Sequence, residues 1–200
     1  MRRGVLMRLA AIFIVTMVAG AYVWAQGNLA SVVAQQVPRC QACHGQGSRV
    51  PIAGVPWLAA QPKVFLENRM VLIREGLSPV ESMKGLLDGL KDDELVALAT
   101  YFSALPVPEP AGKRDSAMAE RGKFITERAL CGSCHLPSQA GREQMPRLAT
   151  QREDYLLLTM RNMLVGKAAG RDTLMTNALG GMKDSDLQDI AHHLATMPAR

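Results

Sequence analysis

Two copies of a Cys-x-x-Cys-His motif constrain this chain more than any other feature of its sequence. They occupy residues 40–44 and 131–135, start 91 residues apart and contain all four cysteines of the 200-residue chain. The segments that follow repeat with nearly the same spacing: 56–61 with 146–151, and 90–95 with 182–187. The offset between corresponding segments changes by only one or two residues, which is typical of two copies of one structural unit.

A proline-rich segment, residues 106–112, separates the two copies. Pro106, Pro108 and Pro110 alternate with other residues. Each proline fixes φ and removes a backbone N–H donor, which favours an extended spacer and excludes a helix. We therefore expect two domains, the first copy at 26–105 and the second copy at 113–200.

Helical patterns dominate both copies. Apolar residues recur at helical spacing over 64–76 and 155–166, and each stretch ends at a glycine, a common helix terminator. The acidic segments 92–93 and 184–186 mark the starts of two closing helices, where short polar oxygens accept bonds from free N–H groups. No segment alternates between apolar and polar residues in the manner of a strand. The predicted fold class is all-α.

The N-terminus has the pattern of an export signal. Three arginines precede an uncharged apolar run at 9–25 that ends in a small residue, which predicts either a cleaved signal peptide at 1–25 or an uncleaved inner-membrane anchor. We expect the remaining chain to be periplasmic, either soluble or anchored. Without residues 1–25 it carries 20 basic and 18 acidic residues, so its formal charge is only +2. This weak charge, without a stripe of basic residues, predicts no nucleic-acid binding.

The cysteine motifs allow three kinds of chemistry. Disulfides fit an exported protein but give no reason for a histidine after each second cysteine. A zinc ribbon usually separates its cysteine pairs by about 15 to 20 residues, whereas Cys43 and Cys131 are 88 apart. Two thiols one helical turn apart can instead bond the two vinyl groups of a haem, with the adjacent histidine presented to the iron. We expect two covalently bound haem c groups. They would also fill cores that contain few rings, since aromatic residues make up only 4% of the chain.

With these motifs the chain resembles the dihaem class I c-type cytochromes of the cytochrome c4 type over about residues 30–200. The resemblance implies two tandem class I cytochrome c domains, each with a proline carbonyl that orients the axial histidine and a leucine that packs on the haem. The residues that match these roles are Cys40, Cys43, Cys131 and Cys134 for covalent attachment, His44 and His135 as axial ligands, Pro56 and Pro146, and Leu58 and Leu148. The family's N-terminal glycine and aromatic residue match Gly122 and Phe124 in the second copy.

The sixth iron ligand must be chosen from nine methionines beyond residue 25. Met83 and Met175 each lie seven residues before a corresponding position of the repeat, and each follows a glycine-terminated helix on an expected loop. Met70 and Met160 also correspond, but they fall inside the preceding helices, where methionine usually fills a core. His192 and His193 fall on the second closing helix, away from the methionine loop, where we expect a packing or surface role.

Histidine and methionine together occupy both axial positions of the iron, which leaves none open for oxygen or a substrate. The sequence therefore predicts an electron carrier and not an enzyme, without a small-molecule substrate. Its partners would be redox proteins, namely a respiratory donor and a terminal acceptor such as an oxidase. The alternative is a cytochrome subunit dedicated to one periplasmic dehydrogenase complex. Catalysis at the haem would need an open iron position, often with histidine or cysteine as a ligand, and the motifs use every cysteine.

Overall fold

The structure is a computed structural model that describes residues 29–46, 52–78, 80–110, 112–167 and 173–199. The expected signal peptide or anchor at 1–25, with its apolar run, lies outside the described residues. Within the described ranges, no helix combines the length and apolar character needed to cross a membrane.

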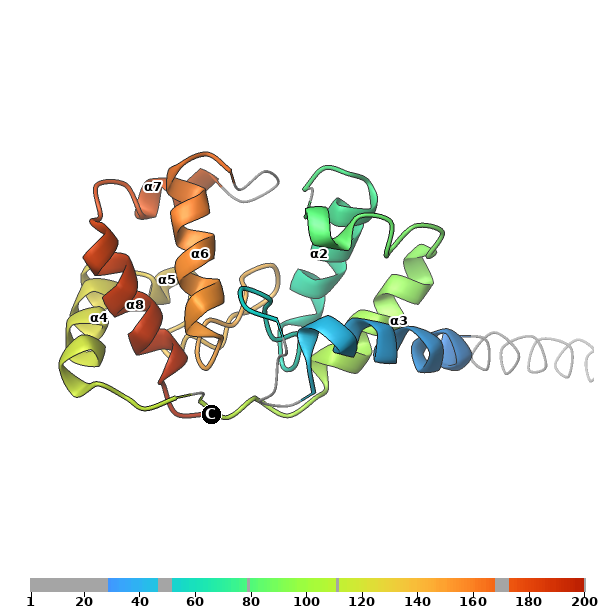
Figure 1. Cartoon of the computed structure of the whole chain (residues 1–200), viewed down its shortest axis with the longest axis horizontal. Helices are drawn as coiled ribbons and strands as arrows, with labels where there is room; N and C mark the ends of the chain where they lie inside the picture. Colours follow the sequence, from blue (N-terminus) through green and yellow to red (C-terminus); the bar gives the residue numbers. More distant parts are fainter. Residues whose placement is uncertain (1–28, 47–51, 79, 111, 168–172, 200) are drawn as a thin grey trace, which may run out of the picture.

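Helices make up the regular structure of both copies (Figure 1). The first copy begins with a helix at 29–44. The elements that follow are α2 (Lys63–Arg74), η1 (Glu81–Met83), α3 (Asp92–Ser103), α4 (Ser116–Arg128), α5 (Gly132–His135), α6 (Glu153–Leu164), α7 (Thr173–Ala178) and α8 (Asp184–Ala195). The described ranges contain no strand, and Arg142 and Met145 form an isolated bridge. The all-α prediction is confirmed.

Each copy has its own hydrophobic core, formed around its closing helix. In the first copy Leu98 and Ala99 of α3 are fully buried, and in the second Ala191 of α8 is fully buried. The segment between α3 and α4 has no helix over its described residues 106–110 and 112–115, as its prolines require. Figure 1 shows it running along one side of the molecule between the two groups of helices.

In each copy the same ion pair joins the closing helix to the long helix that precedes it, α2 to α3 in the first copy and α6 to α8 in the second. An arginine in the last turn of the earlier helix bonds the first residue of the closing helix: Arg74 with Asp92 at 2.7 Å, and Arg161 with Asp184 at 2.6 Å. The third residue of each closing helix provides the N-terminal capping bond. Glu94 accepts from the Lys91 N–H at 2.8 Å and Asp186 from the Lys183 N–H at 2.9 Å. The acidic residues start the closing helices as expected, but those at the first position form ion pairs instead of caps.

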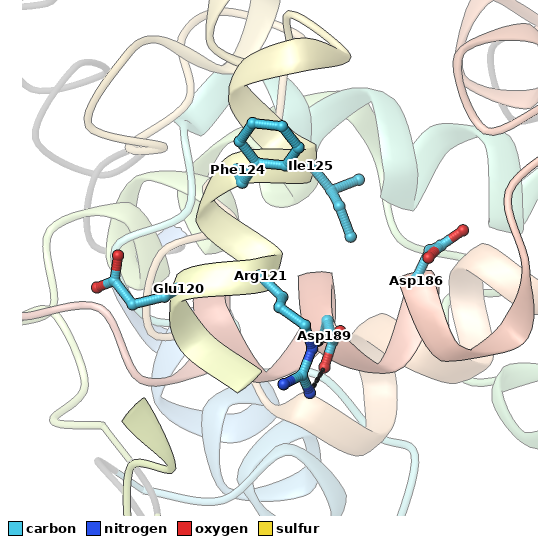
Figure 2. Close-up of a pocket in the computed structure, with 6 residues that line it drawn as sticks. All are labelled: Glu120, Arg121, Phe124, Ile125, Asp186 and Asp189. Carbon is cyan, nitrogen blue, oxygen red and sulfur yellow. Dashed lines mark hydrogen bonds and ion pairs between the residues drawn. The ribbon is translucent and has the colours of Figure 1, made fainter. Parts of the chain in front are cut away.

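In the second copy, α4 crosses α8 at a glycine. A Cβ atom on Gly122 would lie 2.0 Å from the Asp189 carbonyl oxygen, so only glycine permits this approach. Arg121 binds the Asp189 carboxylate with two hydrogen bonds of 2.6 and 2.7 Å, beside a surface depression between the helices (Figure 2). Phe124, in contrast, is 58% exposed, whereas Thr126 is 4% exposed. Phe124, which matches the family's N-terminal aromatic residue, therefore lies at the surface of the described structure.

Candidate haem sites and the boundary between the two copies

The first Cys-x-x-Cys-His motif lies in the last turn of the helix at 29–44. Cys40 contacts the first core, and burial raises the pKa of its thiol. Cys43 is also a free thiol. His44 Nδ1 lies 2.9 Å from the Pro56 carbonyl oxygen, so Nδ1 must carry the proton and donate. Burial lowers the pKa of His44, which favours the neutral ring with a lone pair on Nε2.

The second motif has the same geometry on the short helix α5. His135 Nδ1 lies 2.9 Å from the Pro146 carbonyl oxygen, and burial lowers the pKa of the ring. The side chain is almost completely buried, at 3% exposure, yet its Nε2 atom has no hydrogen-bond partner among the described residues. A buried neutral imidazole with a free lone pair on Nε2 has the chemistry to ligate a metal ion. With the free thiols of Cys131 and Cys134 beside it, this donor set fits a haem c.

The segment that follows each proline is fixed to the closing helix of its own copy. The Ala60 N–H donates to the Phe102 carbonyl at 3.0 Å, and the Thr150 N–H donates to the Leu194 carbonyl at 2.8 Å. Both donors have positive φ angles, 56° and 62°. Because a β-branched threonine adopts this conformation only under strain, the bond at Thr150 maintains a turn that its residue type disfavours. Leu58 and Leu148 contact the first and second cores from these segments.

The expected methionine ligands lie between the long helices of their copies, both half-buried. Met83 ends the 3-10 helix η1, and Met175 lies inside α7, where it contacts the second core. Both connections thus form short helical turns instead of the expected loops. Met70 contacts the first core and Met160 is 7% exposed within the second, in agreement with the core role expected for them.

The histidine pair of α8 is buried within the second copy. His192 uses both of its ring nitrogens: Nδ1 lies 3.0 Å from a carboxylate oxygen of Glu153, and Nε2 accepts from the Asp115 N–H at 2.9 Å. His192 therefore joins α8 to the starts of α4 and α6, which is a packing role. Burial lowers the pKa of His193, whose side chain is 9% exposed beside Gly122. Among the described residues, no three His, Cys, Asp or Glu side chains gather in a group that could bind a metal ion.

The two copies meet through a pair of glutamines that correspond in the repeat. Each glutamine side chain bonds both the backbone N–H and the carbonyl of the residue after the proline in the other copy. Gln151 accepts from the Trp57 N–H at 2.9 Å and donates to the Trp57 carbonyl at 3.1 Å. Gln61 accepts from the Arg147 N–H and donates to the Arg147 carbonyl, both at 3.0 Å. We call these four bonds the glutamine clamp.

A second contact across the boundary has no counterpart in the repeat. The Gly54 N–H donates to the Asp154 carboxylate at 2.8 Å, and the Arg152 guanidinium donates to the Ile52 carbonyl at 3.1 Å. Arg152 also forms an ion pair with Asp154 at 2.7 Å. This contact joins the loop before Pro56 to the start of α6, so the boundary combines a symmetric clamp with two asymmetric hydrogen bonds made by an ion pair of the second copy.

The sequence reasoning did not predict these boundary residues. The repeat itself marks Gln61 and Gln151 as equivalent, and this equivalence was the only available signal. It does not show that each side chain binds the other copy, because that contact depends on how the two copies pack.

No protein-family model matches the chain. It is 30% identical over 190 residues to a thiosulfate dehydrogenase electron acceptor of Thiomonas intermedia (strain K12), which covers 90% of this chain and 88% of that relative. It is 27% identical over 166 residues to the cytochrome c4 of Pseudomonas aeruginosa, which covers 78% of this chain and 82% of that protein. Among solved structures, the cytochrome c4 of Acidithiobacillus ferrooxidans aligns with a TM-score of 0.71 at 26% identity, covering 78% of this chain and 97% of that one.

Proposed function

The chain belongs to the dihaem class I c-type cytochromes of the cytochrome c4 type, and we propose that it carries electrons in the periplasm between a respiratory donor and a terminal acceptor such as an oxidase. The observation that carries the proposal is the repeated site. Each copy has two free thiols followed by a neutral histidine whose Nδ1 is fixed by a proline carbonyl. With a methionine as the second axial ligand the iron would have no open position, which suits outer-sphere electron transfer.

We assign one haem c to each copy, within domains at 26–105 and 113–200. In the first, Cys40 and Cys43 bind the haem covalently and His44 and Met83 ligate the iron. In the second, the corresponding residues are Cys131, Cys134, His135 and Met175. When bound, each haem supplies an iron that exchanges one electron between its ferric and ferrous states. The proline carbonyls at Pro56 and Pro146 fix the imidazole planes, and Leu58 and Leu148 exclude water from the haem faces.

The methionine assignment follows from position and chemistry. A thioether favours ferrous iron and raises the reduction potential, which suits a carrier that passes electrons to an oxidase. Met83 and Met175 lie outside the long helices, on short turns that connect them. Met160, a buried residue of α6, belongs to the hydrophobic core of the same copy and provides a matched control.

Three measurements test this proposal. Pyridine haemochrome analysis of the purified chain should give two haems c per polypeptide, and a value of one or zero would refute the assignment. Met175→His should lower the reduction potential of one haem and leave that of the other nearly unchanged. Met160→Leu should leave both potentials unchanged. Equal collapse of both potentials in the Met175 variant would show that the copies are not independent haem domains.

A second candidate function rests on the relative from Thiomonas intermedia, whose name describes an electron acceptor of a thiosulfate dehydrogenase. In this alternative the chain is a cytochrome subunit dedicated to one periplasmic dehydrogenase. Co-purification of the chain with a catalytic dehydrogenase subunit would favour this alternative. Equally fast reduction by several unrelated donors would favour the general carrier.

Localisation depends on residues 1–25. We propose export to the periplasm, with the leader either removed or retained as an inner-membrane anchor. Sequencing the N-terminus of the protein isolated from its native host distinguishes the two forms, because cleavage after Ala25 leaves Gln26 as the first residue.

A further inference from the structure

A tryptophan at the boundary between the copies has a buried donor without an acceptor. Trp57 is 4% exposed, and its indole Nε1 has no hydrogen-bond partner among the described residues. Buried indole N–H groups almost always find a partner, and leaving one unpaired costs about 1 to 3 kcal/mol. Because the indole nitrogen only donates, the missing partner must be an acceptor.

The backbone of Trp57 is held by hydrogen bonds on both sides. Gln151 of the other copy bonds the Trp57 backbone on both sides, at its N–H and at its carbonyl. The preceding residue, Pro56, orients His44 through its carbonyl, and the following residue, Leu58, contacts the first core. The backbone that carries this donor is thus held directly after Pro56, the residue whose carbonyl bonds the first axial histidine.

Haem chemistry limits the acceptors that this donor can meet. The periphery of a haem c is hydrocarbon except for its two propionate carboxylates, which accept hydrogen bonds and carry negative charge. A hydrogen bond to a carboxylate is roughly twice as strong as one between neutral groups. We propose that Trp57 Nε1 donates a hydrogen bond to a propionate of the haem held by the first copy, and that Trp57 is a positioning residue for that haem. The inference rests on the haem assignment proposed above.

The second copy supports this inference with a different side chain at the same place. Arg147 corresponds to Trp57 in the repeat, and its backbone is bonded on both sides by Gln61. Burial lowers the pKa of its guanidinium. Arginine, like tryptophan, donates hydrogen bonds and accepts none. Both copies therefore place a donor-only side chain beside the proline, neutral in one copy and charged in the other.

The decisive variant is Trp57→Phe in the full-length protein with both haems attached. It keeps an aromatic ring and removes the donor, together with part of the bicyclic ring volume. Without the donor, the negative propionate is less neutralised, which favours the ferric state, so the potential of one haem should fall while the other stays constant. The propionate bending band in the resonance Raman spectrum should shift as well. Trp57→His, which retains a ring N–H, should restore part of both changes.

Two further variants make the measurement specific. Met83→His lowers the potential of the first haem, so it identifies the titration step on which the Trp57→Phe shift should fall. Thr100→Val removes a hydrogen-bond donor from an exposed position of α3, where the hydroxyl bonds the Val96 carbonyl at 2.7 Å, and should leave both potentials unchanged. A shift on the second haem instead would overturn the assignment to the first propionate.

Failure of this inference is distinguishable from failure of the haem assignment. If Trp57→Phe retains two haems with unchanged potentials and an unchanged propionate band, the hydrogen bond does not exist although the haem sites do. If the wild-type protein lacks two haems, the proposed function itself fails. Wild-type protein provides one more test: Trp57 is the only tryptophan beyond Trp24, and its indole proton should exchange slowly with solvent in the reduced state. Rapid exchange would contradict the bond.

Discussion

Replacing Gln151 with alanine should weaken the boundary between the copies more than any other single glutamine substitution. The side chain makes two hydrogen bonds, of 2.9 and 3.1 Å, to the backbone of Trp57, which is 4% exposed. Each bond contributes about 0.5 to 1.5 kcal/mol, and a buried group left without its partner costs about 1 to 3 kcal/mol. Water entering the space left by the amide offsets part of this cost. We expect a loss of about 2 to 4 kcal/mol.

Gln61→Ala should cost less, about 1 to 2 kcal/mol. It breaks two equivalent bonds of 3.0 Å, but these bonds fix Arg147, which is only half-buried, so water can replace them more easily. The two losses should not add in the double variant. Both halves of the clamp maintain the same boundary, and once one half opens the other has less to stabilise.

Denaturant unfolding of the haem-loaded, full-length protein, followed by far-UV circular dichroism, measures these losses. The wild type should unfold at a higher denaturant concentration than Gln151→Ala, and the variant should separate into two transitions as the copies uncouple. Gln188→Ala is the matched control, because this exposed glutamine bonds only Asp184 within α8. If Gln151→Ala is no less stable than Gln188→Ala, the glutamine clamp does not join the copies.

Two other substitutions test the second copy. Gly122→Ala should destabilise it by at least about 3 kcal/mol, since the new Cβ would lie 2.0 Å from the Asp189 carbonyl oxygen. Calorimetry measures this loss. A change below about 1 kcal/mol would refute the close crossing of α4 and α8. His193→Phe should reduce the loss of stability in acid. Burial, followed by the charge of Arg114, lowers the pKa of His193, so the unfolded chain takes up the proton first and stability falls as the pH drops below about 6.5. Unfolding midpoints between pH 7.5 and 5 measure this slope, and equal slopes in variant and wild type would contradict it.

The helices of both copies could be predicted because their signals are local. The glycines that end the periodic stretches, Gly76 and Gly166, have φ angles of 68° and 69°, the left-handed conformation that glycine adopts most easily after a helix. The resemblance to the family, carried by motifs that are also local, implied the bonds of His44 and His135 to the carbonyls of their prolines, which the structure contains. These features need only a few residues of context.

Other features depend on packing, and the sequence did not reveal them. Phe124 has the residue type of a core aromatic, but its place on α4 leaves it exposed, while the smaller Thr126 is buried near the crossing. The glutamine clamp is even harder to predict from the sequence, because the bonds of Gln61 and Gln151 join residues 86 and 94 positions apart in the chain. Only the arrangement of one folded copy against the other determines such contacts.

The clamp also connects the two proposed haem sites mechanically. Gln151 bonds the residue directly after Pro56, and Pro56 orients His44, so a displacement of the second copy acts on the support of the first axial histidine. Gln61 makes the reciprocal connection to the residue after Pro146. The backbone contacts are symmetric, but a neutral indole stands on one side and a cationic guanidinium on the other. Because a positive charge within a partly buried boundary favours the reduced state of a nearby redox centre, we expect the two proposed haems to differ in potential.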